Sequence, residues 1–102
     1  MLDTSQIIKI RKTITEEDTT LSSLFNVLGD KNRFRILKML IQNGELCVSD
    51  IAAILDVSIS SVSQHLRILE MSGLVMGERM GQMICYKPLI ENPRIKAIIN
   101  LI

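Results

Sequence analysis

Two helical patterns joined by a very short turn constrain the fold of this chain more than any other feature. Ser49 and Ser58 each stand just before an apolar helical run and can cap its first turn. The first run ends at Leu55 and the second at about Met71, with Asp56-Val57 between them. Two capped helices separated by about three residues are typical of a helix-turn-helix.

A β-hairpin is predicted directly after the second of these helices. Leu74–Arg79 and Met83–Lys87 fit two short strands around the turn Met80-Gly81-Gln82, and Pro88 ends the second strand. We also expect the segment before Ser49 to pair with the second strand of the hairpin. A helix-turn-helix followed by such a hairpin is a winged helix.

Three further helical patterns flank this unit. Thr19 or Thr20 can cap a first helix, which Gly29 stops, and Asp30 can cap a second one. Pro93 opens a last helix at the end of the chain. The predicted fold class is therefore mainly α with a small β-hairpin, a winged helix-turn-helix.

The apolar composition favours an oligomer. The 102 residues are 47% hydrophobic, with a mean hydropathy of +0.28, whereas a chain this short buries only roughly 60 to 70% of its unfolded surface. Isoleucines recur at helical spacing in the last helix, and such a stripe needs a surface to cover it. We expect a homodimer formed by the first and last helices, through Leu21, Leu24, Ile95, Ile98, Ile99 and Ile102.

No repeat or Pro/Gly-rich linker divides the sequence. We therefore predict an N-terminal arm over residues 1–19 and one DNA-binding and dimerisation domain over residues 20–102. No segment has the roughly 18 consecutive apolar residues of a membrane span, and Cys47 and Cys85 are too few for a secreted disulfide framework. A cytoplasmic protein without a membrane partner is expected.

The helix from Ser58 to Met71 is predicted to read DNA. One side carries Ile59, Val62 and Leu66, which we expect to pack inward, and the opposite side carries short hydroxyls and an amide. Such groups reach base edges in a major groove, and Gln can pair with adenine through two hydrogen bonds. The candidate contacts to double-stranded operator DNA are Ser60, Ser61, Ser63, Gln64, His65 and Arg67 on this helix, and Arg79 and Gln82 on the hairpin.

Three stretches also resemble a known family. They are LSSLFNVLGDKNRFRILKML (21–40), ELCVSDIAAILDVSISSVSQHLRILEMSGLV (45–75) and GERMGQMICYKP (77–88). They are similar to the ArsR/SmtB family of small dimeric winged-helix repressors, and the resemblance covers about residues 20 to 102. It implies a homodimer that binds a palindromic operator and leaves it when a metal or another inducer acts on the protein.

The metal sites of that family are incomplete in this chain. Many relatives carry Cys-x-Cys where this sequence has Cys47-Val48-Ser49, and another family site uses Asp and His residues of the last helix, whereas residues 93–102 contain no His, Asp, Glu or Cys. Soft ions prefer three or four thiolate or imidazole ligands. We therefore predict no metal site, no cofactor and no tight metal binding by the reduced protein.

Two interpretations of the cysteines stay open. The simpler one, which the sequence favours, treats Cys47 and Cys85 as unrelated small apolar residues. The alternative is a thiol pair that oxidation converts to a disulfide, since strand alternation with Leu46, Val48, Ile84 and Tyr86 inward would point both cysteines to the other face. A methionine cluster about the hairpin fits copper(I) or oxidation sensing less well than flexible packing; its members are Met71, Met76, Met80 and Met83.

A sequence-specific transcriptional repressor of unknown inducer is the function we expect. Two alternatives stay open: a winged-helix module that binds proteins and no DNA, which the net charge of only +1 supports, and a metal-responsive repressor that uses Cys47 and Cys85. The chain has a single His, no Gly-rich phosphate loop and no nucleophile–base arrangement at plausible spacing. It is therefore not expected to be an enzyme.

Overall fold

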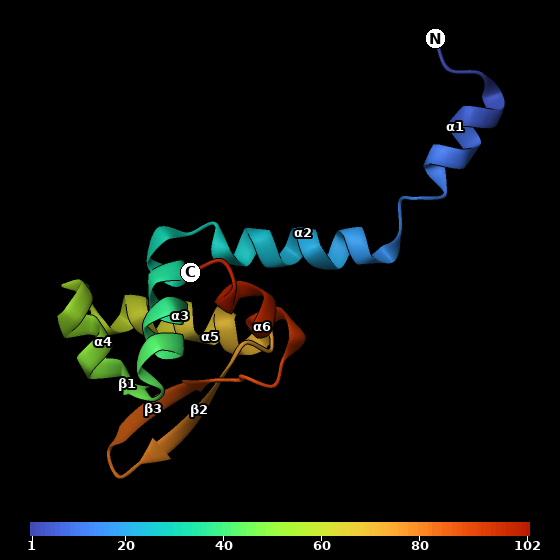
Figure 1. Ribbon diagram of the computed structural model, residues 1–102. Helices are drawn as coiled ribbons and strands as arrows, with labels where there is room; N and C mark the ends of the chain where they lie inside the picture. The colour runs from blue at the N-terminus through green and yellow to red at the C-terminus, as the bar shows by residue number, and fades with distance from the viewer.

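The computed structural model describes residues 1–102 as six helices and a small sheet (Figure 1). The order along the chain is α1, α2, α3, β1, α4, α5, β2, β3, α6. The bounds are α1 Thr4–Arg11, α2 Glu16–Leu28, α3 Lys31–Asn43, β1 Leu46–Cys47, α4 Val48–Leu55, α5 Ile59–Met71, β2 Val75–Met80, β3 Met83–Pro88 and α6 Pro93–Ile99. This is the predicted winged helix-turn-helix.

One apolar core holds α3, α4, α5 and α6 together. Helix α3 contributes three side chains to its centre, because Ile36, Leu37 and Leu40 fall at helical spacing and are fully buried. No polar or charged residue is buried, so the core is held by apolar packing alone. Its other members are Leu24, Val48, Ile51, Ala52, Val62, Leu66, Leu69, Leu74, Val75, Ile95 and Ile98.

The corner between α2 and α3 is fixed by two charged side chains. Asp30 caps α3 by accepting a hydrogen bond from the Arg33 amide at 3.0 Å, as the sequence predicted. Arg33 turns its guanidinium back onto the end of α2, where it donates to the carbonyl oxygens of Val27 and Asn26. The last carbonyls of a helix lack the amide partners of its interior, so Arg33 adds to a C-terminal cap in which the Gly29 amide also donates to the Asn26 carbonyl.

Helix α2 begins earlier than the sequence predicted. Its cap is Thr15, and Asp18 accepts a hydrogen bond from the Thr15 amide at 2.8 Å, so the predicted caps Thr19 and Thr20 were wrong. The carboxylates of Glu16, Glu17 and Asp18 occupy the first turn, where they interact favourably with the positive end of the helix. This acidic turn extends the helix upstream of its apolar residues.

The sheet has the order β1-β3-β2, and both pairings are antiparallel. Leu46 lies opposite Tyr86 and Cys47 opposite Cys85, which confirms the predicted pairing of the segment before α4 with the second strand of the hairpin. The predicted cap Ser49 was wrong, because Cys47 is the N-cap residue and α4 begins at Val48. The chain passes from strand to helix without a connecting loop.

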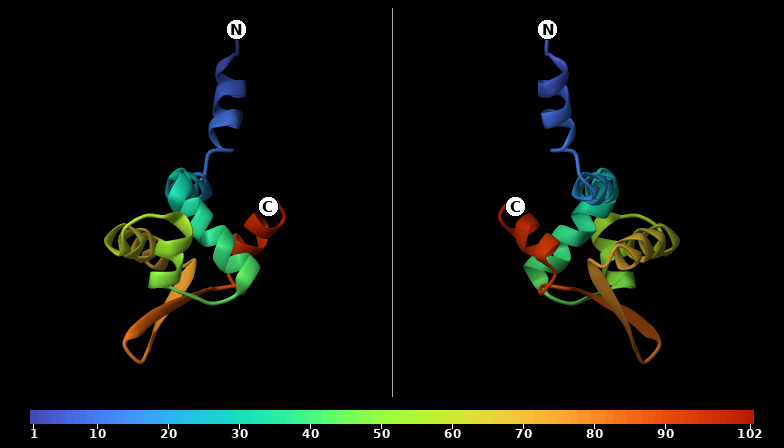
Figure 2. Two further views of the ribbon diagram at one scale, coloured as in Figure 1. Left: turned by 90° about the vertical axis from the view of Figure 1, so that its left-hand side faces the viewer. Right: turned by 90° about the vertical axis from the view of Figure 1, so that its right-hand side faces the viewer.

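The two ends of the molecule project from this core. Helix α1 has no buried residue and stands beyond the start of α2, while the hairpin extends from the opposite side (Figure 2). The molecule is therefore elongated, with a long axis of 63 Å against 25 and 22 Å for the other two. None of its helices is both long enough and apolar enough to cross a membrane.

Candidate nucleic-acid interface and thiol pair

Helix α5 divides into a buried face and a polar face. Val62, Leu66 and Leu69 are fully buried, so they fix the rotation of the helix on the core. Ser58 caps it as predicted, because its hydroxyl accepts a hydrogen bond from the Ser61 amide at 3.0 Å. The predicted contacts Ser60, Ser63, Gln64 and Arg67 are exposed, and Ser61 is half-buried.

The wing turn and α5 border one cavity of about 250 Å³. Ser63 of α5 and Gln82 of the turn both line it, which brings two of the predicted DNA contacts to the same hollow of the surface. Ile59 and Ile84 also line it, and they are 57% and 42% exposed. The predictions that these two isoleucines pack inward were wrong, because the outer half of the hairpin extends past the core and leaves both uncovered.

A glycine and a tyrosine set the base of the wing. Gly77 of β2 lies opposite Tyr86 of β3, and a Cβ atom on Gly77 would come within 2.7 Å of the Tyr86 ring. Glu70 accepts a hydrogen bond from the Gly77 amide at 3.0 Å and so joins the end of α5 to the hairpin. Burial, together with the Glu70 charge, raises the pKa of Tyr86 above 10.0. Arg79 lies farther out on β2 and is exposed, as a DNA contact requires.

His65 differs from the other predicted contacts. Its Nε2 atom lies 3.7 Å from Oδ1 of Asp30, its side chain is only 16% exposed, and its buried Nδ1 atom has no hydrogen-bond partner. The hydrogen bond from the Arg33 amide is the main cause that lowers the pKa of Asp30 below 3.8; burial opposes it, and the nearby His65 ring adds a smaller lowering. His65 therefore contacts the start of α3 from α5, whereas Gln64 faces solvent.

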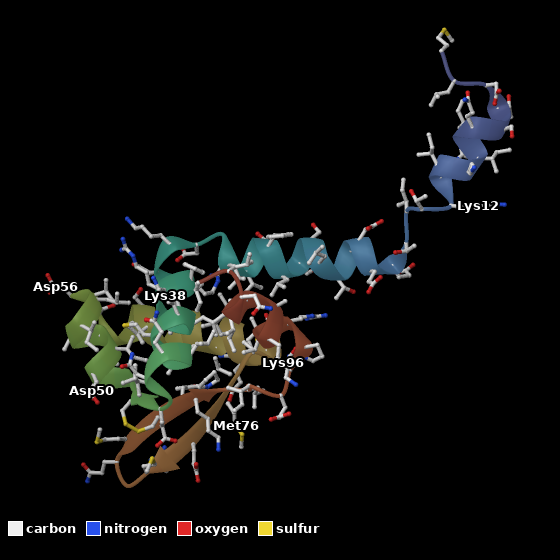
Figure 3. All side chains as sticks on the ribbon, viewed as in Figure 1. Lys12, Lys38, Asp50, Asp56, Met76 and Lys96 are labelled. Carbon is white, nitrogen blue, oxygen red and sulfur yellow. A yellow bond between two sulfur atoms is a disulfide. The ribbon has the colours of Figure 1, made fainter.

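Cys47 and Cys85 form a disulfide (Figure 3). The bond joins the N-cap residue of α4 to the central strand of the sheet, across a separation of 38 residues. Cys85 is buried, whereas Cys47 is half-buried. The favoured interpretation of two unrelated apolar residues was wrong, and direct strand pairing explains why, since opposite residues on neighbouring strands place their side chains on one face.

The predicted dimer residues fall into two groups. Leu24, Ile95 and Ile98 are buried in the core of the chain itself. Leu21, Ile99 and Ile102 are 52%, 41% and 39% exposed. Two further apolar side chains, which the sequence analysis did not select, lie on the same helices or just beyond them: Phe25 at 63% and Leu101 at 81% exposure.

Comparison with known proteins places this architecture in a family. The sequence profile described as "Bacterial regulatory protein, arsR family" matches residues 30–76, from the cap of α3 into β2. The chain is 37% identical over 82 residues to the cadmium resistance transcriptional regulatory protein CadC of Listeria innocua, an alignment that covers 80% of this chain and 67% of that protein. The chain belongs to the ArsR family.

Two further comparisons agree in sequence and in fold. The arsenical resistance operon repressor of Escherichia coli K12 is 39% identical over 64 residues, which cover 63% of this chain and 55% of that repressor. The structure of HlyU from Vibrio cholerae superposes with a TM-score of 0.76 at 31% identity, over 86% of this chain and 92% of that one. This ArsR protein is thus a transcriptional regulator with a winged helix-turn-helix, and not an enzyme.

Proposed function

We propose that this ArsR protein is a homodimeric, sequence-specific DNA-binding repressor that reads its operator with α5 and the wing. The observation that carries the proposal is the shared hollow of Ser63 and Gln82, because it lets one DNA duplex contact the helix and the wing together. Ser60, Ser61, Ser63 and Gln64 would read base edges, and Arg67 and Arg79 would bind phosphates. His65 would instead position α5 through Asp30.

The exposed apolar side chains of α2 and the chain end support a twofold partner. Leu21, Phe25, Ile99, Leu101 and Ile102 are the proposed interface, whereas Leu24, Ile95 and Ile98 support it from within the core. A related ArsR-type DNA-binding domain from Mycobacterium bovis, 27% identical with a TM-score of 0.68, is described as homodimeric. The division into an arm over 1–19 and a functional domain over 20–102, and the cytoplasmic location, stay predictions.

Salt-dependent binding tests the DNA-binding role. Fluorescence anisotropy with a labelled fragment of the protein's own promoter should give an affinity that falls linearly with salt on logarithmic axes, since each phosphate contact releases counterions. A fragment of scrambled sequence should bind more weakly at every salt concentration. Absence of binding even at low salt would favour the alternative of a winged-helix module that binds proteins.

Oxidation of Cys47 and Cys85 is the inducing event that we propose. A peroxide takes two electrons and two protons from the thiol pair, so that one S–S bond forms and hydrogen peroxide leaves as two molecules of water. The resulting bond ties the first residue of α4 to the wing, and thereby restricts how the wing and α5 adjust to DNA. Two relatives are named for cadmium and arsenical resistance, so a metal bound by Cys47 and Cys85 is the alternative inducer.

Three samples test this switch: the oxidised protein, the reduced protein and the reduced Cys47→Ser variant. We expect the reduced protein and the variant to bind the promoter fragment alike, and the oxidised protein to bind it at least about tenfold more weakly, a difference of roughly 1.4 kcal/mol. Equal affinity of all three samples would refute the switch without affecting the DNA-binding role.

A further inference from the structure

Sulfur-bearing side chains gather on one face of the wing. Met80 lies opposite Met83, Glu78 opposite Cys85, and Cys85 opposite Cys47. Residues that lie directly opposite on antiparallel strands share a face, as do residues two apart along a strand, so Met83 and Cys85 also share it. Figure 3 shows the yellow disulfide with other sulfur atoms on the hairpin near it.

Met80 and Met83, the two methionines of this face beside the turn, are half-exposed. Met80 and Met83 are 50% and 45% exposed, whereas a residue that fills a core gap is buried. Both flank the turn, at the end of β2 and the start of β3. Met80 and Met83 therefore lie outside the core of the chain, and their thioethers are accessible to a ligand.

We propose that the reduced Cys47 and Cys85, with the thioethers of Met83 and Met80, form a copper(I) site on the wing, which departs from the expectation from the sequence that the reduced protein binds no metal tightly. The two sulfur atoms that join in the disulfide lie close enough to bind one ion together once a dithiol reductant has given two electrons and two protons to the S–S bond and has itself become a disulfide. Met83 is two residues from Cys85, about 6.8 Å along the strand. Met80, which lies opposite Met83, is the diagonal neighbour of Cys85 on β2. Long, flexible methionine side chains can reach Cys85 from both positions.

The donor set selects copper(I) over other ions. Thiolates and thioethers together are the ligands of soft copper(I), while zinc takes thiolate, imidazole or carboxylate ligands. No three His, Cys, Asp or Glu side chains are grouped so that they could hold a metal, and the thioethers are the further ligands that we propose. On binding, both thiols release a proton and copper keeps its charge of +1, which leaves a complex of net charge −1.

This site uses the thiol pair of the proposed function but does not depend on DNA binding. Metal binding excludes the disulfide, because each sulfur that ligates copper must be a thiolate. The two proposals are separated by measuring metal affinity on the full chain without DNA, and DNA affinity on the metal-free reduced protein. A protein that binds DNA but no copper(I) would refute only the copper site, and a protein that binds copper(I) but no DNA would refute only the proposed function.

Competition between the reduced protein and a chromophoric copper(I) chelator, under anaerobic conditions, tests the site. We expect one copper(I) per chain, a loss of affinity of about a hundredfold for Cys85→Ser, and about tenfold for either Met80→Leu or Met83→Leu. Met76→Leu, on the same face but farther from the turn, and Met71→Leu, on α5, should leave the affinity unchanged.

Stability of the metal-free protein provides the control for folding. If the thioethers act as ligands, Met80→Leu and Met83→Leu should weaken copper(I) binding and leave the urea midpoint of the metal-free reduced protein unaltered, which a disturbed wing would not do. A double Met80→Leu, Met83→Leu variant that binds copper(I) as tightly as the original chain would overturn the proposal. Failure of the reduced protein to bind stoichiometric copper(I) would overturn it as well.

Discussion

The carboxylate of Asp30 and the imidazole of His65 meet between the start of α3 and the middle of α5, with Oδ1 and Nε2 3.7 Å apart. Because Asp30 also caps α3, one carboxylate links the core helix to the helix that carries the proposed base contacts. His65 thereby contributes to the orientation of α5 although its ring is largely buried.

Acid should weaken the contacts that Asp30 makes at the start of α3. The pKa of Asp30 is lowered below 3.8, so its carboxylate stabilises the native state above that pH, and the contribution is lost as the pH falls through the lowered value. We expect Asp30→Asn to reduce the urea midpoint at pH 7, and the gap to the original chain to narrow by about pH 2.5. If the difference in urea midpoint between the two proteins stays constant from pH 7 to about pH 2.5, the Asp30 carboxylate is not the stabilising group.

Gly77→Ala should destabilise the wing. The added methyl group would lie 2.7 Å from the Tyr86 ring, and relief of this overlap should cost about 1 to 3 kcal/mol of unfolding free energy. Tyr86→Leu should remove most of the penalty, so a double-mutant cycle of chemical denaturation should give a coupling energy near the cost of the single change. Additive effects of the two substitutions would refute the contact.

Several elements followed from the sequence because their causes are local. Ser58 and Asp30 cap their helices as predicted, and Gly29 directly follows α2. Ile59 and Ile84 were misplaced because periodicity shows which side of an element is apolar but not where the core ends. Helical periodicity, which also indicates faces alone, could not predict that the His65 ring lies against Asp30.

The disulfide between Cys47 and Cys85 also could not be predicted from a periodic pattern. Strand alternation indicated that Cys47 and Cys85 share a face, but register alone decides whether two such residues are opposite, and the sequence fixes register only loosely in a strand of two residues. The Arg33 contact with the end of α2 was likewise missed, because it depends on the angle between two helices. An Arg three residues after the Asp cap is the available signal.

Gln64 and Arg79 should affect DNA binding in different ways. Gln64→Ala should reduce discrimination against a changed operator base by about 1 to 3 kcal/mol and leave the salt dependence unchanged. Arg79→Ala should weaken binding to all sequences and lower the slope of affinity against salt by about one. Gln42→Ala, at an exposed amide on α3, is the matched control. Identical losses for Gln64→Ala and Gln42→Ala would count against base reading by α5.

Phe25→Glu should dissociate the dimer. Phe25 is 63% exposed, so a charge there leaves the chain's own core intact but would be desolvated in the proposed interface. We expect a loss of at least about 2 kcal/mol, roughly thirtyfold in the dissociation constant from sedimentation equilibrium. Ile54→Glu, at a 60% exposed position on α4, should leave the dimer unaffected. Equal dimerisation by both variants would exclude this surface.

Hydroxyl-radical footprinting on the protein's own promoter tests most directly whether a twofold pair of α5 helices reads DNA. The reduced protein should protect two symmetry-related segments on one side of the duplex, with centres about 10 base pairs or a multiple of that apart. Gln64→Ala should weaken the protection of both segments to the same extent. A single protected segment, or uniform cleavage at low salt, would contradict the account.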